Sequence, residues 1–501
     1  GARVHLERAP LKYAGLSYTE IWISEAQERM VLAVPPENVE ALKAICDEEH
    51  VELADLGHFG TENEELILYY ADTEVGRLSM HFLHEGIPTP TREATWAPPA
   101  PKGQATTPTL PRAQEALLRL LSHPTIASKH WIIRQYDHEV QGNTILKPLV
   151  GPGGRGPGDA AVLEPVPRTS RGIAIGCGLA PPLGDPLVPG SDPYQMAIAA
   201  IDECVRNIVC VGGDPMRTAI LDNFCWPSCA KPENLGSLVR AAEGCYVGAK
   251  AYRTPFVSGK DSLNNQLRYT DPSTGQEKLI EIPPTLLITG LAYVRNITRC
   301  VTMDAKKPGN LLVLVGVTQP HMAGSLYASL LGEQPFGPPY DTIPAPDLAV
   351  GPAAARAVAQ CIQDGLVQSA HDPSEGGLLV AVAEMLIATT GSTTQPTPRG
   401  SALADLLARD SGPRALGAEL TLRDDLLEVE QVAFNESPSR YVLEVRPEDL
   451  PKIRTVMRDY GGVRVTPIGK ITDSGRLTWQ FADLDVRVTD LAEAWLNPLD
   501  W

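Results

Sequence analysis

The sequence predicts a mixed α/β protein in which mixed β-sheets are covered by helices. Apolar strands alternate with helical patterns over roughly residues 123–301. An all-apolar segment, Leu311–Val317, is of the type that is buried on both faces of a sheet, and helices follow it. The third observation is an internal repeat, because Glu25–Glu37 matches Glu436–Glu448 at a constant offset of 411 residues.

The individual elements follow from apolar periodicity and from capping residues. Asp192 and Pro193 form an N-cap and first-turn pair for the longest predicted helix. Helices are expected at Ala113–Ser122, Asp192–Val211, Leu348–Asp364 and Gly377–Thr389, and strands at Ala160–Leu163, Gly172–Ile175, Arg217–Leu221 and Thr285–Ala292.

Both copies of the repeat continue into a helix that starts with Pro and Glu, and then into a strand that we expect to end at Gly57 or Gly469. A long segment starting near Thr302, which looks like a domain, precedes the second copy, whereas only 24 residues precede the first. We therefore expect residues 1–91 to be the end of a domain that needs an absent N-terminal segment or another chain to cover its apolar face. Because the first residue is Gly1, we expect that it is not the native start.

Composition excludes several classes of protein. The formal net charge of −18 is opposite to what a duplex-binding surface needs, so we expect no nucleic-acid partner. No window of 18 apolar residues predicts a membrane span, and no signal-peptide core begins the chain. The nine cysteines, an odd number mostly in apolar runs, indicate buried thiols in a reducing compartment, and hence a cytoplasmic protein.

Several acidic side chains have a pattern that suits Mg²⁺ and phosphate. Glu203 and Asn207 lie four residues apart on one face of the predicted helix, and Asp159 begins a strand after the Gly-rich loop Gly151–Gly158. Asp372 lies next to Gly376 and Gly377 at a helix start. The alternatives are an ordinary surface pair for Glu203 and Asn207, and a simple capping loop for His371–Gly377.

Two further segments are expected to carry polar side chains from strand ends into turns. Pro255–Leu263 delivers Ser258, Gly259, Lys260, Asp261 and Ser262 into one turn, and Leu221–Phe224 ends its strand in an Asx-type turn. Such dense polar sets after an apolar strand are typical of ligand-binding loops.

Taken together, these segments resemble the PurM-like superfamily, and within it the synthetase region of the formylglycinamidine ribonucleotide synthase family. The resemblance rests on Val31–Glu37, Gln135–Val140, Asp202–Pro215, Val257–Ser262 and His371–Leu378. It implies tandem ATP-binding A domains and partner B domains. Residues 1–91 would then end a first B domain, 92–122 would be a Pro-rich linker and helix, 123–301 a second A domain and 302–501 a second B domain.

The resemblance also implies a ligase reaction of purine biosynthesis. ATP would phosphorylate the formyl amide oxygen of formylglycinamide ribonucleotide, and ammonia would displace phosphate from this iminophosphate to give the amidine. The ammonia would come from glutamine through a separate glutaminase subunit, with a small accessory subunit as a further partner. The family's catalytic residues lie in a first A domain that this chain lacks, so we expect the fragment to be inactive alone.

Residue by residue, the resemblance assigns Asp222, Gly259 and Lys260 to ATP binding. It assigns Glu25, Ala26, Gln27 and Ser262 to substrate binding, although Ala26 replaces a serine of the family pattern. Asp159, Glu203, Asn207 and Asp372 match metal ligands of an auxiliary nucleotide site, and Ser374 belongs to the same site. Lys260 stands where many relatives have Asn, and Glu375 stands where Asp is commoner.

Two alternatives remain open from the sequence. One is a non-catalytic scaffold in which the auxiliary nucleotide is a permanent structural element. The other is a different PurM-like synthetase, such as aminoimidazole ribonucleotide synthetase, although such proteins have one A–B unit and the 411-residue repeat indicates two.

Overall fold

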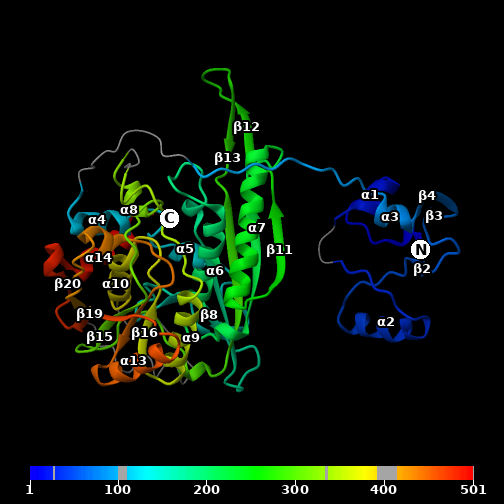
Figure 1. Cartoon of the computed structure of the whole chain (residues 1–501). Coiled ribbons are helices and arrows are strands. Elements are labelled where there is room, and N and C mark those ends of the chain that lie inside the picture. The colour runs from blue at the N-terminus through cyan, green and yellow to red at the C-terminus, as the bar shows by residue number, and fades with distance from the viewer. Residues whose placement is uncertain (26–28, 100–109, 333–336, 392–414, 500–501) are drawn as a thin grey trace. The chain divides into compact units, whose positions relative to one another are not determined.

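The computed structural model describes residues 1–25, 29–99, 110–332, 337–391 and 415–499. Contacts divide the chain into two compact units, Gly1–Arg92 and Glu93–Trp501 (Figure 1). Among the described residues, no helix is both long enough and apolar enough to cross a bilayer.

The first unit is a small four-stranded sheet with short helices. Its strand order is β2-β1-β3-β4, in which β1 and β3 are parallel and the other neighbours are antiparallel. Its elements are β1 (Ala2–His5), α1 (Tyr18–Ile23), α2 (Val39–Glu48), β2 (Gly57–Phe59), β3 (Glu65–Tyr70), β4 (Thr73–Ser79) and α3 (Met80–Glu85).

The second unit begins with a region built on a six-stranded sheet of order β11-β10-β14-β9-β8-β5. Helix α6 packs on β9 and β14, and α7 packs along α6. In chain order, the elements up to the end of this sheet are α4 (Ala113–Leu121), α5 (His130–Ile133), β5 (Thr144–Leu146), β6 (Leu149–Val150), β7 (Gly156–Pro157), β8 (Ala161–Leu163), β9 (Gly172–Leu179), α6 (Pro193–Cys210), β10 (Thr218–Cys225), α7 (Pro232–Tyr252), β11 (Phe256–Ser262), β12 (Gln266–Thr270), β13 (Glu277–Glu281) and β14 (Thr285–Val294), of which α4 packs against α14 (Val488–Leu496) and α10 (Gly377–Ile387). The hairpin β12–β13 projects beyond the rest of the unit (Figure 1).

A seven-stranded sheet of order β16-β18-β15-β19-β17-β20-β21 organises the rest of the unit. Strand β15 is covered on both faces, because Val313 and Val315 belong to one core cluster and Leu312 and Leu314 to another. The elements are β15 (Leu311–Val315), α8 (Leu326–Ser329), α9 (Val350–Gln363), β16 (Val367–His371), α10 (Gly377–Ile387), β17 (Gly417–Leu420), α12 (Val429–Phe434), β18 (Tyr441–Val445), α13 (Leu450–Asp459), β19 (Val465–Thr472), β20 (Arg476–Trp479), β21 (Leu484–Arg487) and α14 (Val488–Leu496).

The predicted helices and strands are confirmed to within a few residues. Asp192 caps α6 by accepting a hydrogen bond from the backbone N–H of Tyr194. Two strands are longer than expected, and β15 is shorter, because it ends at Val315. Strand β10 runs through Leu221–Phe224 and β11 through Ser258–Ser262, so neither polar set lies in a turn. Pairing between β10, β11 and β14 extends both strands past their apolar residues.

The sequence repeat is also a structural repeat. Helices α1 and α2 match α12 and α13 at the same 411-residue offset. The sheet order β2-β1-β3-β4 reproduces β19-β17-β20-β21, with one parallel pair in the same place. The expected strand ends are wrong, because β2 begins at Gly57 and β19 continues past Gly469 to Thr472.

The two copies differ in burial. Met30, Val31 and Leu32 are 88%, 83% and 56% exposed and lie outside any strand, whereas their counterparts Tyr441, Val442 and Leu443 are at most 1% exposed. In the second copy, β18 lies between β15 and β16. Among the described residues of the first unit, no strand plays the part of β15 or β16.

Candidate functional site

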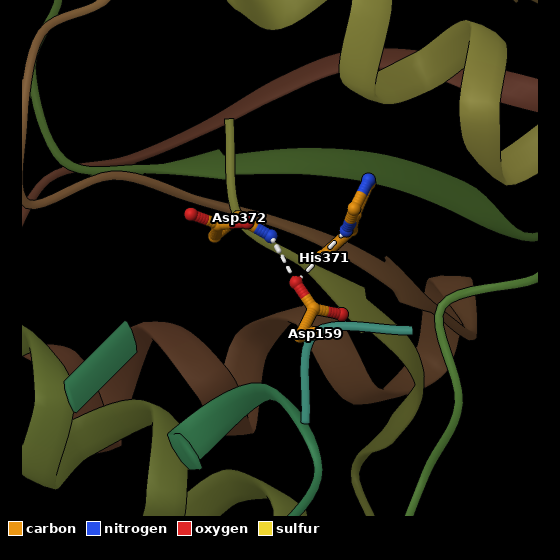
Figure 2. Close-up of side chains that lie close together, drawn as sticks. All are labelled: Asp159, His371 and Asp372. Atoms are coloured by element: carbon orange, nitrogen blue, oxygen red, sulfur yellow. Dashed lines mark hydrogen bonds and ion pairs between the residues drawn. The ribbon is translucent and has the colours of Figure 1, made fainter. Parts of the chain in front are cut away.

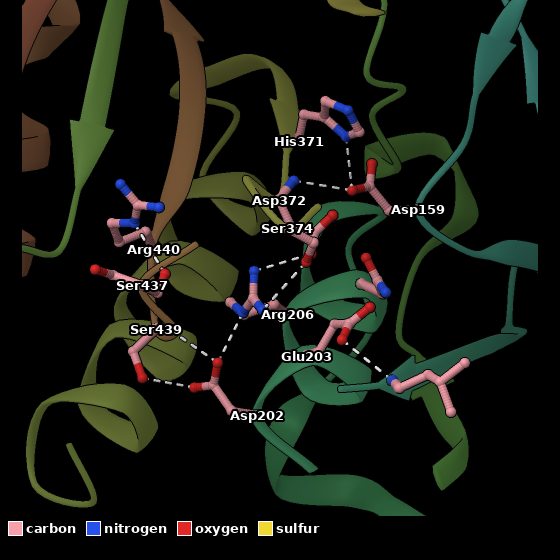
Figure 3. Close-up of polar contacts among 12 residues, drawn as sticks. Asp159, Asp202, Glu203, Arg206, His371, Asp372, Ser374, Ser437, Ser439 and Arg440 are labelled. Atoms are coloured by element: carbon pink, nitrogen blue, oxygen red, sulfur yellow. Dashed lines mark hydrogen bonds and ion pairs between the residues drawn. The ribbon is translucent and has the colours of Figure 1, made fainter. Parts of the chain in front are cut away.

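The four residues predicted to bind metal come from three segments of the second unit. Glu203 and Asn207 lie on α6, whereas Asp159 precedes β8 and Asp372 follows β16. Residues far apart in the sequence are therefore brought into one cluster, which lies where the six-stranded and seven-stranded regions meet (Figure 3).

Asp159, His371 and Asp372 form one corner of the cluster, with potential ligand atoms within 4.8 Å of one another (Figure 2). Asp159 Oδ1 interacts with His371 Nδ1 at 2.9 Å and accepts the backbone N–H of Asp372 at 2.9 Å. The other ring nitrogen of His371 lies 3.1 Å from Glu384 Oε2. Although burial lowers the pKa of His371, the two flanking carboxylates raise it well above its usual value, which favours the protonated imidazole.

Arg206 forms the centre of the cluster and is only 5% exposed. Its guanidinium donates to Asp202 at 2.8 Å, to Asp372 at 2.9 Å and to the hydroxyl of Ser374 at 3.3 Å. Ser374 in turn donates to Asp372. Figure 3 shows Arg206 between Asp202 on one side and the Asp372–Ser374 loop on the other.

Glu203 and Asn207 point inward, which excludes the alternative of an ordinary surface pair. Glu203 Oε2 accepts the backbone N–H of Leu179 at 3.1 Å, and Asn207 Nδ2 donates to the carbonyl of Cys177 at 2.8 Å. Asn207 is 8% exposed, and its Oδ1 is buried without a hydrogen-bond partner. Burial, and then the charges of Glu375 and Asp372, raise the pKa of Glu203 well above its usual value.

The glycines of the loop Gly151–Gly158 are used for packing. A Cβ at Gly151 would lie 2.0 Å from the carbonyl oxygen of Ala388, and one at Gly156 would lie 2.6 Å from the Cβ of Ala388. These glycines therefore allow the loop to approach the end of α10 closely.

The residues predicted to bind ATP lie on two neighbouring parallel strands at the edge of the six-stranded sheet. Asp222 on β10 is paired in register with Gly259 on β11, and Asn223 is paired with Lys260. Lys260 Nζ is 3.2 Å from the hydroxyl of Ser262, on the same strand. Burial, and then the nearby charge of Asp261, raise the pKa of Asp222.

Of the predicted substrate-binding residues, Ser262 lies at the end of β11. Glu25 is exposed and follows α1, whereas Ala26 and Gln27 lie outside the described residues.

Arg206, His371, Glu384 and Asp202 were given no role by sequence reasoning. A signal existed for two of them, because Asp202 and Arg206 are spaced four apart on a helix that is otherwise apolar on that side. Glu384 is the single charged residue of α10.

Models of one protein family match most of the chain. The model of the AIR synthase related protein C-terminal domain matches residues 1–68 and 307–481, so it falls on both copies of the repeat. The model of the N-terminal domain of the same family matches residues 157–275.

The chain belongs to the AIR synthase related protein family.

Within this family, the chain is similar to phosphoribosylformylglycinamidine synthase subunits PurL. It is 32% identical over 461 residues to the one from Thermococcus gammatolerans, covering 92% of this chain and 56% of that protein. It is 30% identical over 525 residues to the one from a Synechococcus strain, covering 100% and 62%. The chain therefore spans about three fifths of the length of the curated relatives it matches.

A solved family structure, the Thermotoga maritima PurL complexed with FGAR, superposes with a TM-score of 0.51 at 17% identity. The superposition covers 76% of this chain and 54% of that one. This likeness supports the PurM-like fold expected from the sequence.

Proposed function

We propose that this chain is part of an ATP-dependent ligase that converts formylglycinamide ribonucleotide to formylglycinamidine ribonucleotide with glutamine-derived ammonia. The observation that carries the proposal is the similarity to PurL subunits over nearly the whole chain. A separate glutaminase subunit and a small accessory subunit are the partners that this function implies.

The strand pair β10–β11 is the proposed contact with the reacting ATP and substrate. Asp222, Gly259 and Lys260 lie side by side there, and Ser262 follows on the same strand edge. Because Gly259 has no side chain, the Asp222 carboxylate can lie over β11. Lys260 supplies a positive charge that suits a phosphate.

The test uses the full gene product that contains this chain, supplied with ATP, Mg²⁺, ammonium chloride and formylglycinamide ribonucleotide. We expect release of ADP that depends on the ribonucleotide, together with the amidine product, detected by mass spectrometry. ADP release at the same rate without the ribonucleotide would refute the proposal.

Replacing Gly259 by alanine should lower kcat/KM for ATP about tenfold, which corresponds to about 1.4 kcal/mol of transition-state stabilisation. A Cβ at this position would lie 2.5 Å from Asp222 Oδ1, so the carboxylate must move while the strand remains intact. Steady-state kinetics at varied ATP concentration would measure the effect.

The same substitution at Gly275 is the control, because that glycine lies in the tip of the β12–β13 hairpin, where an added Cβ meets nothing within 4 Å and only the local backbone, at a φ of +68°, is strained. It should leave kcat/KM unchanged. Equal effects of the two variants would remove Gly259 and Asp222 from the ATP site.

The acidic cluster is proposed as a Mg²⁺–nucleotide site formed by Asp159, Glu203, Asn207, Asp372 and Ser374. The buried Oδ1 of Asn207 lacks a hydrogen-bond partner, and Glu203 forms no ion pair among the described residues. These oxygen atoms are therefore suitable ligands for Mg²⁺, which is bound by oxygen. A bound Mg²⁺ would neutralise nucleotide phosphates there. The chain's own residues hold the carboxylates in place through Arg206 and His371.

Residues 1–91 are proposed to be the end of a first B domain, followed by the linker and helix 92–122, the second A domain 123–301 and the second B domain 302–501. The exposed segment around Val31 supports this proposal, because its counterpart in the second copy is a buried central strand. Another segment or chain would supply strands equivalent to β15 and β16.

We therefore expect the amides of Met30–Val34 to exchange with deuterium freely in the 501-residue chain. The amides of Val442–Val445 should be protected at least a thousandfold, because they pair within the seven-stranded sheet. Hydrogen exchange read by mass spectrometry compares the two copies within one sample. Similar protection of both segments would contradict the proposed domain organisation.

A further inference from the structure

The carboxylates of the acidic cluster differ in whether the protein already neutralises them. Asp159 faces the imidazole of His371 at 2.9 Å, and Asp372 faces the guanidinium of Arg206 at 2.9 Å. Among the described residues, Glu203 and Glu375 form no ion pair at all. The cluster is therefore divided into carboxylates with a built-in counter-ion and carboxylates without one.

One carboxylate oxygen of Asp372 already has a cationic partner. Its Oδ2 receives both the guanidinium of Arg206 and the hydroxyl of Ser374. Arg206 also donates a hydrogen bond to Asp202, and Asp202 in turn accepts hydrogen bonds from the backbone N–H and the hydroxyl of Ser439. Moving Arg206 away from Asp372 would leave a buried cation short of a partner, which is costly.

A second observation, at Asn207, indicates that a ligand binds beside this residue rather than at Asp372. The Oδ1 of Asn207 is buried and has no donor, although buried polar atoms are nearly always paired. Its Nδ2 is anchored to the carbonyl of Cys177. Glu203 lies one turn away on the same face of α6, and its carboxylate is also held inward by the backbone N–H of Leu179.

We propose that Arg206 takes the place of a metal ion at Asp372, so that the site binds a single divalent cation through Glu203 and Asn207. This inference rests on the proposed Mg²⁺–nucleotide site and changes its ligand set, because Asp372 becomes an anchor for Arg206. Two protein ligands are enough for Mg²⁺, which commonly keeps waters or phosphates in its remaining positions.

The test measures binding of Mn²⁺, as a probe of the divalent site, to the metal-free full chain by electron paramagnetic resonance. Glu203→Gln and Asn207→Leu should each weaken Mn²⁺ binding at least tenfold. Asp372→Asn, which keeps an acceptor for Arg206 and Ser374, should change the affinity less than threefold. An equal loss for Asp372→Asn and Glu203→Gln would overturn the proposal.

A second comparison gives an effect that damage to the fold cannot imitate. In an Arg206→Gln background, Asp372 loses its counter-ion and becomes available, so Mn²⁺ should bind more tightly than to the wild type. Asp372→Asn should then weaken binding at least tenfold in that background alone. The same small effect of Asp372→Asn in both backgrounds would refute the role given to Arg206.

The outcomes separate this inference from the proposed function. No Mn²⁺ binding to the wild type would overturn the metal site and this inference together, while the ligase activity is decided by ribonucleotide-dependent ADP release. If Arg206→Gln fails to fold, the comparison of Asp372→Asn with Glu203→Gln in the wild-type background still decides between the two ligand sets.

Discussion

Replacing Asp202 by alanine should lower the free energy of unfolding of residues 93–501 by about 3–5 kcal/mol, the usual effect of breaking a buried ion pair. Asp202 is 1% exposed and accepts hydrogen bonds from Arg206, Tyr252 and Ser439. Without it, the hydroxyl and backbone N–H groups of Ser439 remain buried without this acceptor, and Arg206 retains Asp372 as its one ion-pair partner among the described residues. Guanidinium unfolding followed by far-ultraviolet circular dichroism would measure the change.

Asp425→Ala is the matched control for this prediction. Asp425 is also paired with an arginine, Arg423, but both side chains are largely exposed, at 80% and 68%. Exposed pairs contribute about 0–1 kcal/mol, so this variant should unfold close to the wild type. Equal midpoints for the two variants would show that the Asp202 network does not stabilise the fold.

The second large effect concerns pH. Burial, and then the charge of Glu375, raise the pKa of Glu436 to about 8 from its usual 4.5, although the N–H groups of Gly376 and Leu326 oppose the shift. The folded protein keeps this proton up to about pH 8, whereas the unfolded chain releases it above about pH 4.5. Stability contributed by this group is therefore present at low pH and is lost as the pH rises from 4.5 to 8.

Glu436→Gln removes the titration while it retains an acceptor for Gly376 and Leu326. The stability of the variant relative to the wild type should rise by roughly 3–5 kcal/mol between pH 5 and pH 8.5, at about 1.4 kcal/mol for each pH unit of the shift. Unfolding curves of both proteins at each pH give this difference, in which the other titrating groups largely cancel.

Glu243→Gln, at an exposed glutamate paired with Arg240, controls for the loss of a carboxylate. Its stability relative to the wild type should hardly depend on pH in this range. A flat difference for Glu436→Gln as well would mean that Glu436 is ionised in the folded protein throughout.

Much of the fold follows from local signals in the sequence. The apolar run in β15, the Asp192 cap of α6 and the 411-residue repeat each predict a feature that the structure contains. The strand ends are predicted less well. Asp222 and Lys260 look like turn residues locally, but cross-strand pairing of β10 with β11 and β14 keeps them in the sheet.

The candidate metal site was foreseen only in part, because its members come from distant segments. Ligand atoms of Asp159 and Asp372 lie within 4.8 Å of each other, Ser374 bonds to Asp372, and Glu203 and Asn207 point inward from α6. The partners that neutralise two of them could not be read from the sequence. Arg206 reaches Asp372 across 166 residues, and His371 reaches Asp159 across 212. No periodic pattern reports such a pairing.

One feature of the core also bears on how the protein is made. A single hydrophobic cluster joins Ala174, Ile208 and Val294 to Val358, Leu443 and Met457. The six-stranded region therefore cannot complete its interior when it leaves the ribosome and must wait until α13 has been synthesised. During that interval its apolar helices remain open to chaperones and to aggregation. Once complete, residues 93–501 should unfold in one cooperative step rather than one domain at a time.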